Sequence, residues 1–366
     1  MRVLMLSKAC IVGAYQRKLE ELAAEPDVEL TVAMPPHWQD ERGITPLERA
    51  HTRGYDVEIL PMAFNGHFHL HFYPGFERLM KRCHPDVVHI DEEPYNFATF
   101  HANRIARRRR ARTLWFSWQN LQRVYPWPFS VFECYNLRNV DYGIVGSRTA
   151  ADVWRAKGYA GALAVIPQFG VDPELFTPPE APRPLSPVVL GYAGRLVPEK
   201  GVDLLLEALQ GVQGEWRLDL FASGPEEGRL RAMAEQEALR ERVVFHDLVP
   251  SVAMPEIYRS MDVFVLPSRT RANWTEQFGR VLIEAMASGV AVVGSATGEI
   301  PHVIGDAGLT FGEDDREALR AALDRLVGDP LLRRELGARG RARVLAHFTQ
   351  RRVASATADV YREIMG

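Results

Sequence analysis

The chain has few of the features that mark secreted, metal-stabilised or membrane-spanning proteins. Its 366 residues include three cysteines, Cys10, Cys83 and Cys134, which cannot form a disulfide framework, and no CxxC pair offers a zinc site. No stretch approaches the ~20 apolar residues of a membrane span, and the apolar run Val3–Leu6 near the start is too short for a signal peptide. We therefore expect a cytoplasmic protein that does not cross a bilayer.

The sequence also lacks an overall charge of one sign. Forty-four Lys and Arg residues face 47 Asp and Glu residues, a net charge of −3, which excludes a general nucleic-acid binder. This balance conceals a basic segment, because residues 101–160 contain eleven Lys or Arg and three acidic residues, a local charge of +8. Hydrophobic residues make up 46% and charged residues 25%, as in an ordinary globular protein.

Short runs of Val, Ile and Leu alternate with amphipathic stretches along the first half of the chain. The runs, which we predict to be strands, are Val3–Leu6, Leu30–Ala33, Val57–Leu60, Val87–Ile90, Thr113–Phe116, Tyr142–Val145 and Ala162–Ile166. Predicted helices between them include Gln16–Ala24, Phe76–Cys83 and Phe97–Arg108. Strands that are apolar on both faces and joined by helices indicate a doubly wound α/β domain with a parallel sheet.

A proline-rich segment, Thr177–Pro187, interrupts this pattern and is typical of a linker. The alternation then resumes with predicted strands at Val188–Tyr192, Trp216–Phe221, Val243–Phe245, Val263–Leu266, Val290–Val293 and Leu309–Phe311. We predict two Rossmann-like domains, residues 1–176 and 188–350, and a terminal helix over Arg351–Ile364 in the last segment, 351–366. Open sheets bind ligands beyond the carboxyl ends of their strands, so two domains facing a cleft suit a reaction between two substrates.

The segment Trp274–Ile304 is the most informative part of the sequence. Glu276 and Glu284 stand eight residues apart, and a helix beginning near Phe278 would direct its free N–H groups toward an anion such as phosphate. Glu276 would then precede the helix, within reach of sugar hydroxyls, and Glu284 would lie two turns in, where it can bind a ribose diol. The alternative is a pair of solvated glutamates on a surface helix.

A second segment, Val188–Leu209, places cations at a strand-to-helix turn. Gly194 and Arg195 follow the predicted strand, and Lys200 comes just before the next helix. Guanidinium and ammonium groups in this position suit a diphosphate, whereas the alternative is a glycine-rich loop with surface charges. The spacing matches neither a P-loop nor a GxGxxG turn.

In order and content, these segments resemble the retaining glycosyltransferases of family 4, which have the GT-B fold of two Rossmann-like domains. EQFGRVLIEAMASG is similar to that family's E-x7-E motif, and GYAGRLVPEKG to its diphosphate-binding turn. FASGPEEGRL, VFVLPS and VIPQFGVDPELFTP resemble further stretches of the family. The resemblance implies an acceptor-binding domain, a linker at 177–187, a donor-binding domain, and a C-terminal helix that packs back on the first domain.

The resemblance also implies roles for individual residues. Arg195 and Lys200 would hold the diphosphate of a nucleotide-sugar donor, and Glu276 would contact the transferred sugar; we take these three as the catalytic set. Glu284 would bind the ribose, and the donor would also meet the residues of the two glycine loops and the helix start, which are Gly13, Gly194, Phe278, Gly279 and Leu282. For Gly13 the alternative is an ordinary turn glycine.

The sequence departs from the family at one position. Gln119 stands where the family usually has a His, and glutamine cannot exchange a proton near neutral pH. We therefore assign Gln119 to sugar positioning, the alternative being a polar end of a buried strand. Glu92 and Glu93 follow the predicted strand Val87–Ile90 and are candidates to polarise an acceptor hydroxyl, unless they only favour a helix N-terminus.

Two further patterns have weaker support. The alternating His67, His69 and His71 invite a metal site, but no carboxylate or cysteine pattern accompanies them and no DxD motif occurs, so we predict no bound metal. The arginines of Arg104–Arg112 either end a solvated helix or provide a basic face for an anionic membrane or a phosphorylated acceptor.

These observations predict a retaining hexosyltransferase without a cofactor. It would use a nucleotide-diphospho-sugar and an unidentified glycan, lipid-linked or phosphorylated acceptor, in the cytoplasm or at the inner face of the membrane. Two alternatives stay open: a nucleotide-sugar epimerase or hydrolase, and a catalytically silent partner subunit that binds sugar nucleotides.

Overall fold

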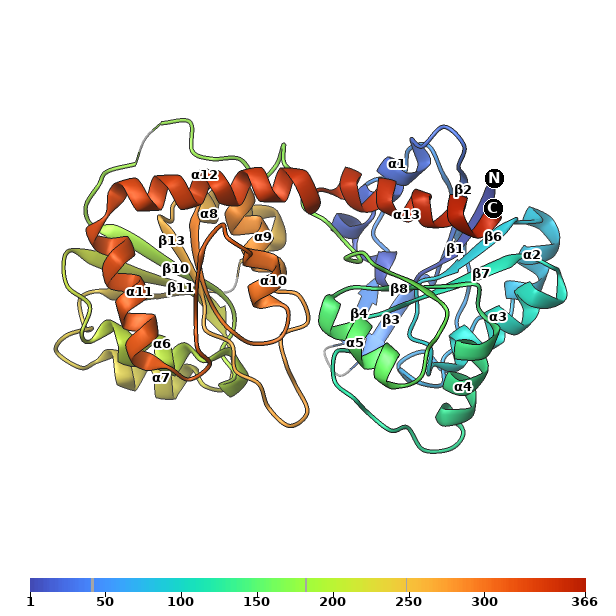
Figure 1. Ribbon diagram of the computed structural model, residues 1–366, viewed down its shortest axis with the longest axis horizontal. Coiled ribbons are helices and arrows are strands. Elements are labelled where there is room, and N and C mark those ends of the chain that lie inside the picture. The colour runs from blue at the N-terminus through green and yellow to red at the C-terminus, as the bar shows by residue number, and fades with distance from the viewer. Residues whose placement is uncertain (41–42, 182, 248) are drawn as a thin grey trace. The chain divides into compact units, whose positions relative to one another are not determined.

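The computed structural model describes residues 1–40, 43–181, 183–247 and 249–366 (Figure 1). The chain divides into two compact units. Unit 1 comprises Met1–Gly170 with Gln350–Gly366, and unit 2 comprises Val171–Thr349. No helix among the described residues is both long and apolar enough to cross a membrane.

Unit 1 is built on a seven-stranded parallel sheet in the order β5-β2-β1-β6-β7-β8-β9. Its strands are β1 (Arg2–Leu6), β2 (Glu29–Met34), β5 (Asp56–Ile59), β6 (Val87–Ile90), β7 (Arg112–Ser117), β8 (Tyr142–Val145) and β9 (Ala162–Val165). Its helices are η1 (Ala9–Ile11), η2 (Gly13–Tyr15), α1 (Arg17–Ala23), α2 (Phe76–Cys83), α3 (Phe97–Arg108), α4 (Phe129–Asn139), α5 (Arg148–Ala156) and α13 (Gln350–Met365). A hairpin of β3 (His37–Asp40) and β4 (Gly43–Pro46) stands apart from this sheet. The sequence pattern did not predict the hairpin, which is short and mostly exposed.

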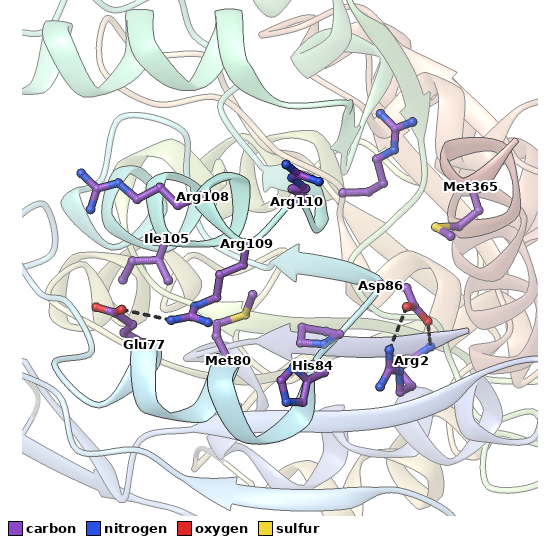
Figure 2. A pocket seen from close by; sticks show the side chains of 12 residues that line it. Arg2, Glu77, Met80, His84, Asp86, Ile105, Arg108, Arg109, Arg110 and Met365 are labelled. Carbon is purple, nitrogen blue, oxygen red and sulfur yellow. Dashed lines mark hydrogen bonds and ion pairs between the residues drawn. The ribbon is translucent and has the colours of Figure 1, made fainter.

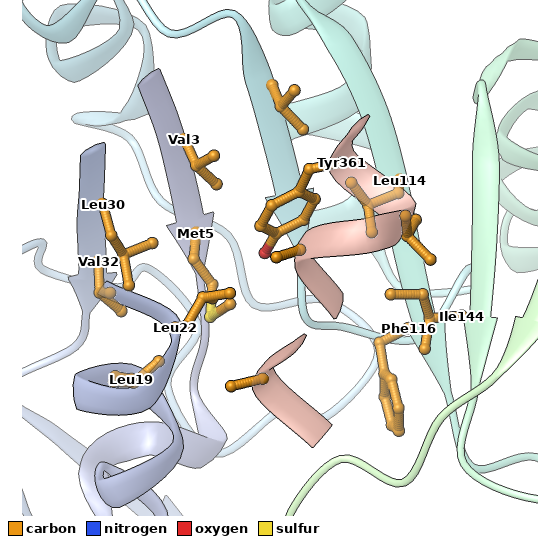
Figure 3. Packing of buried hydrophobic residues seen from close by; sticks show 14 of the residues in the cluster. Val3, Met5, Leu19, Leu22, Leu30, Val32, Leu114, Phe116, Ile144 and Tyr361 are labelled. Atoms are coloured by element: carbon orange, nitrogen blue, oxygen red, sulfur yellow. The ribbon is translucent and has the colours of Figure 1, made fainter. Parts of the chain in front are cut away.

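Both faces of this sheet are covered, as the doubly apolar strands predicted. Val3 and Met5 of β1 pack with α1 and α13 on one face, while Leu4 and Leu6 pack with α2 and α3 on the other. Figure 3 shows the first of these clusters, in which Tyr361 of α13 lies over the strands. The amino ends of β1, β6 and β7 border a hollow lined with arginines (Figure 2).

The C-terminal helix belongs to unit 1, which confirms the expectation that the chain crosses back. Tyr361 is fully buried, and its hydroxyl lies 2.7 Å from Nδ1 of His89 on β6. At the exposed end of the helix, Arg362 pairs with Glu25 at 2.7 Å and with Asp27 at 2.6 Å. The regularly spaced apolar residues predicted for this helix therefore form the face that packs against the core of unit 1.

Unit 2 contains a six-stranded parallel sheet in the order β12-β11-β10-β13-β14-β15. Its strands are β10 (Val188–Arg195), β11 (Trp216–Ser223), β12 (Val243–His246), β13 (Val263–Leu266), β14 (Ala291–Ser295) and β15 (Leu309–Phe311). Its helices are η3 (Pro198–Lys200), α6 (Val202–Leu209), α7 (Glu227–Ala234), η4 (Ser251–Ala253), α8 (Met254–Arg259), α9 (Arg280–Ala287), α10 (Ile300–Ile304), α11 (Arg316–Gly328) and α12 (Pro330–His347). Two Rossmann-like parallel sheets in one chain match the predicted fold class.

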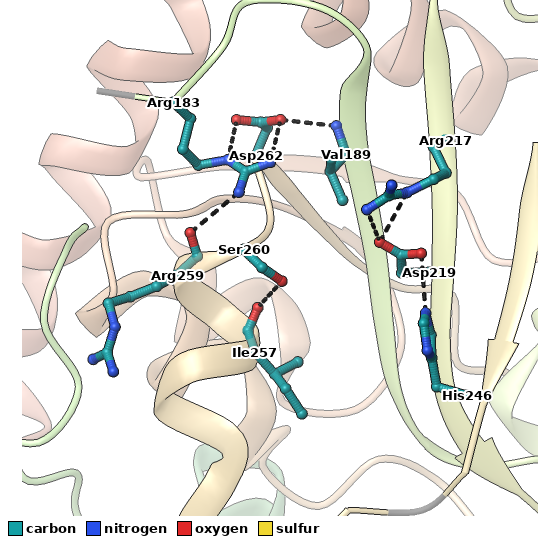
Figure 4. A network of polar contacts seen from close by, with 9 residues as sticks. All are labelled: Arg183, Val189, Arg217, Asp219, His246, Ile257, Arg259, Ser260 and Asp262. Atoms are coloured by element: carbon teal, nitrogen blue, oxygen red, sulfur yellow. Dashed lines mark hydrogen bonds and ion pairs between the residues drawn. The ribbon is translucent and has the colours of Figure 1, made fainter. Parts of the chain in front are cut away.

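The residues predicted as a linker, 177–187, lie within unit 2 apart from residue 182, which is outside the described residues. Arg183 pairs with Asp262 through its Nε at 3.1 Å, and Asp262 also accepts the N–H of Val189 at 2.8 Å (Figure 4). These contacts join the segment to the first residues of β10 and β13. In the same figure Asp219 of β11 accepts from Arg217 at 2.8 Å and lies 3.1 Å from His246.

Candidate functional site

In unit 2, charged residues gather at the carboxyl ends of β10 and β13. β10 ends at Arg195, whose guanidinium is half exposed and lies 3.8 Å from Glu199. Gly194 immediately precedes it, and Lys200 ends the short helix η3. Gly201 follows with φ +65°, and a Cβ there would collide with the Pro267 carbonyl oxygen, so this tight turn requires glycine.

Lys200 and Glu276, two of the predicted catalytic residues, contact each other directly. Lys200 Nζ lies 2.6 Å from Glu276 Oε2, and both side chains are mostly buried. The Ser268 hydroxyl donates to the same oxygen at 2.9 Å, and the Trp274 ring lies 4.8 Å from the ammonium group. A cation and a carboxylate fixed side by side can bind a phosphate and an adjacent sugar hydroxyl at the same time.

Glu284 lies on α9, in an environment that changes its acidity. Its carboxylate accepts from Tyr258 at 3.0 Å and lies 2.8 Å from Nε of Arg280. Burial raises the pKa of Glu284, although Arg280 and the Tyr258 hydroxyl oppose this effect. Helix α9 begins at Arg280 and not near Phe278, so the prediction that Glu284 lies two turns in was wrong, and this residue is the fifth of the helix.

The shift of the helix start has a local cause. Gly279 takes φ +77° as the N-cap, a left-handed conformation that cannot continue a helix backward to Phe278. Phe278 is buried and contacts Phe348 edge to face at 5.8 Å, and Leu282 is fully buried. Phe278 and Leu282 therefore hold the helix in place, and the free N–H groups of α9 begin two residues later than the sequence suggested.

In unit 1, a second group of charged residues follows the carboxyl ends of β1 and β6. Glu92 is buried, with Lys8 Nζ at 3.6 Å and His71 Nε2 at 3.4 Å. Burial alone would raise the pKa of Glu92, but Lys8 and His71 outweigh it and hold the pKa at about 2. Nδ1 of His71 is buried and has no hydrogen-bond partner among the residues that the structure describes.

Glu93, the next residue, has the opposite acidity. Its carboxylate accepts the Ser117 hydroxyl at 2.5 Å and the N–H of Trp118 at 2.8 Å. Burial raises its pKa to about 7, and these two hydrogen bonds only partly offset burial. Two adjacent carboxyl groups with pKa values pushed apart are suited to different roles, one as a fixed charge and one as a proton acceptor near neutral pH.

Gln119 follows β7, and its side chain forms hydrogen bonds with other residues of the same loop. Nε2 donates to the Leu121 carbonyl at 3.0 Å, and Oε1 accepts the Tyr125 hydroxyl at 3.3 Å. Gly13 opens η2, where its N–H donates to Glu48 Oε2 at 2.6 Å. The roles predicted for these two residues, sugar positioning and phosphate contact, stay predictions.

The structure adds residues that sequence reasoning missed: Lys8, His71, Ser117, Tyr258 and Ser268. Three of them, Lys8, Ser117 and Ser268, stand at or just after the carboxyl end of a predicted strand, which is a signal that could have found them. His71 belongs to the histidine series considered for a metal. That segment forms turns and not the strand that the metal hypothesis required.

Comparison with known proteins identifies unit 2. Residues 176–343, which include Arg195, Lys200, Glu276 and Glu284, match the family model described as glycosyl transferases group 1. Unit 2 is therefore similar to this family over these residues. The match covers the donor side of the predicted enzyme, where the sequence motifs were also most specific.

Proteins of known function that resemble this chain align with it over part of their length. The GDP-mannose-dependent alpha-(1-6)-phosphatidylinositol monomannoside mannosyltransferase of Mycolicibacterium smegmatis is 33% identical over 51% of this chain and 52% of its own length. The lipopolysaccharide core biosynthesis mannosyltransferase LpcC of Rhizobium leguminosarum is 32% identical over 57% of this chain and 63% of its own. The chain thus spans between half and two thirds of these relatives.

Solved structures extend the likeness in fold to the whole chain. Sucrose-phosphate synthase of Thermosynechococcus elongatus has a TM-score of 0.72 at 22% identity, covering 100% of this chain and 99% of its own. Anabaena HepE in complex with UDP has a TM-score of 0.75 at 17% identity, covering 99% and 100%. These likenesses establish the GT-B fold, which confirms the predicted fold class.

Proposed function

We propose that the protein transfers a hexosyl group from a nucleotide-diphospho-sugar to an acceptor hydroxyl with retention of the anomeric configuration. The observation that carries the proposal is the Lys200–Glu276 contact of 2.6 Å within a group 1 glycosyltransferase domain. Negative charge grows on the leaving diphosphate, and Lys200, Arg195 and the N–H groups at the start of α9 are cations and dipoles fixed in advance for that charge. No metal or cofactor is part of this proposal.

We assign the remaining donor contacts by the same reasoning. Glu276 binds hydroxyls of the transferred sugar beside the diphosphate, and Glu284 binds the ribose of the nucleotide. Gly194 and Gly279 let the backbone approach the donor closely, while Gly13 serves the donor phosphate from unit 1. The leaving phosphate itself assists attack on the same face of the sugar, since no side chain is assigned as a nucleophile.

Unit 1 supplies the acceptor site in this proposal. Glu93 polarises the acceptor hydroxyl, and the Glu92–Lys8 pair fixes the charge beside it. The relatives named above act on a phosphatidylinositol mannoside and on a lipopolysaccharide core, which favours a glycolipid or glycan acceptor here as well. We place the reaction in the cytoplasm at the inner face of a membrane, where the exposed Arg104 and Arg107 face anionic lipid.

Donor and acceptor variants test the proposal separately. Lys200→Ala and Glu276→Ala should abolish transfer while the circular dichroism spectrum stays that of the folded protein. Lys81→Ala, which removes a Lys that is 61% exposed on α2, is the matched control and should keep full activity. Wild-type activity in either site variant would exclude this assignment, and an inverted anomeric bond in the product by NMR would exclude retention.

A donor panel then distinguishes the proposed enzyme from its alternatives. GDP-, UDP-, ADP- and dTDP-sugars are compared by thermal shift, since a ligand at 100 times its Kd adds about 2.7 kcal/mol of stability. Transfer that requires an acceptor supports the proposal. Release of free or epimerised sugar without an acceptor indicates a hydrolase or epimerase, and donor binding without any turnover indicates a silent subunit.

A further inference from the structure

The arginine-lined hollow of unit 1 lies at the sheet edge opposite the acceptor residues. Because the strands are parallel, their amino ends share one edge and their carboxyl ends the other. β7 begins with Arg112 at the hollow and ends with Ser117 beside Glu93, which separates the two places by about 17 Å along the strand. The hollow has a volume of about 590 Å³, the size of a small-molecule site.

The lining of the hollow is strongly basic. It consists of Arg2, Glu77, Met80, His84, Pro85, Asp86, Ile105, Arg108, Arg109, Arg110, Arg112 and Met365. Five arginines and two carboxylates give a net charge of +3 with His84 neutral. Figure 2 shows Arg108, Arg109 and Arg110 at the end of α3, with Arg109 directed to Glu77.

The carboxylates neutralise only part of this charge. Glu77 lies 3.2 Å from Arg109, Asp86 lies 3.2 Å from Arg2, and Asp141, outside the lining, lies 2.9 Å from Arg112. Across the part of the chain that the structure describes, neither Arg108 nor Arg110 has an ion-pair partner. Two exposed guanidinium groups at one hollow therefore repel each other unless an anion binds between them.

Backbone conformation gives an independent indication. Arg110 has φ +61° and His84 has φ +43°, and each directly follows the last turn of a helix, where glycine is the usual residue. Among the described residues, only two other non-glycine residues have positive φ. Both positions thus carry a strained residue with a functional side chain, and both side chains line the hollow.

We propose that this hollow binds a phosphate-bearing anion at a site separate from the donor site. A guanidinium group can bind two phosphate oxygens at once, and Arg108 and Arg110, which pair with no carboxylate of the described residues, suit a diphosphate or a phosphate headgroup. The anion is either a soluble diphosphate or the headgroup of an anionic phospholipid. The site does not depend on the proposed transferase function, because it shares no residue with the donor or acceptor sites.

Titration calorimetry of the full chain with inorganic pyrophosphate tests the proposal. In the double variant R108Q/R110G, affinity should fall about a hundredfold, roughly one order of magnitude for each of the two hydrogen-bonded charges removed. Glycine suits the left-handed conformation at residue 110, so the variant should fold, which circular dichroism checks. R104Q/R107Q is the matched control for the pyrophosphate titration: it removes two exposed arginines from the same helix, neither of which lines the hollow.

Further measurements identify the binding site and the source of the anion. Lys200→Ala should leave pyrophosphate binding in the hollow intact; if it alone removes binding, the donor site is responsible and the proposal fails. Equal loss in both arginine pairs, or no binding by the wild-type chain, also overturns it. Binding to phosphatidylcholine vesicles that contain phosphatidic acid, lost in R108Q/R110G and displaced by pyrophosphate, assigns the site to a lipid headgroup. Pyrophosphate binding without vesicle binding assigns it to a soluble anion.

Discussion

Glu93 should titrate near neutral pH, and both stability and activity should follow this titration. Its pKa rises from the usual 4.5 to about 7 because the carboxyl is mostly removed from water. The folded state therefore binds the proton more tightly than the unfolded state. The contribution of Glu93 to stability is then greatest below pH 4.5 and is lost as pH rises toward 7, at about 1.36 kcal/mol per pH unit.

The size of this effect follows from the two pKa values and from the exposure of the side chain. If the Glu93 carboxyl were fully buried, the free energy of unfolding would fall by about 3 kcal/mol between pH 4.5 and pH 7. Glu93 keeps some contact with solvent, which reduces the cost, and we expect about 1–3 kcal/mol. Glu92 acts in the opposite direction and at lower pH, since its pKa of about 2 stabilises the fold above pH 4.5 and that stability is lost as pH falls toward 2. The pH ranges over which Glu93 and Glu92 change the stability do not overlap.

Carboxyl NMR of ¹³C-labelled glutamate measures the titration directly. Glu93→Gln identifies the Glu93 signal, which should inflect near pH 7, and the transfer rate of the wild type should rise through the same range. Glu92→Gln should move the inflection to lower pH, because the negative charge of Glu92 contributes to the raised pKa of Glu93. An inflection near pH 4.5, or a pH–rate profile unchanged in Glu93→Gln, would refute the reasoning.

Three substitutions test other features of the fold by denaturation. Arg110→Gly should raise stability by about 1 kcal/mol, because glycine adopts φ +61° without strain, and a loss would contradict this. Gly298→Ala should destabilise unit 2 by about 1–3 kcal/mol and reduce transfer, since φ is +52° and the new Cβ would collide with the Glu276 carbonyl. Tyr361→Phe should cost about 1–3 kcal/mol by leaving Nδ1 of His89 buried and unpaired, whereas an unchanged melting temperature would show that the bond is dispensable.

Hydrophobic patterning was sufficient to predict most of the architecture. The strands Val87–Ile90 and Val263–Leu266 and the helices Phe76–Cys83 and Phe97–Arg108 have the bounds that the sequence predicted. These segments are buried on one or both faces, so their apolar periodicity is imposed by packing. The β3–β4 hairpin has almost no buried face and leaves no such pattern.

The candidate site was predictable in its residue types but not in its pairings. Residue spacing and the family resemblance together pointed to Lys200 and Glu276, whereas their 2.6 Å contact joins residues 76 apart and depends on how β10 and β13 lie together. The same holds for Glu93, whose acidity results from burial against Ser117 on a neighbouring strand. The start of α9 was misplaced because the helix-forming pattern begins before Gly279, while the positive φ of that glycine is a property of the folded backbone.

The two units present a cation in the same way. In each unit, a lysine follows the strand that comes first along the chain, β1 or β10. Lys8 pairs with Glu92 and lies near the Trp38 ring. Lys200 pairs with Glu276 and lies near the Trp274 ring. The carboxylate fixes the position of each ammonium group, and the ring covers one side of it. An ammonium group has three donors, so one pairing leaves others for a ligand. Binding of a negatively charged or hydroxyl-rich ligand therefore needs no movement of the lysine, which is the condition for electrostatic stabilisation to act without reorganisation.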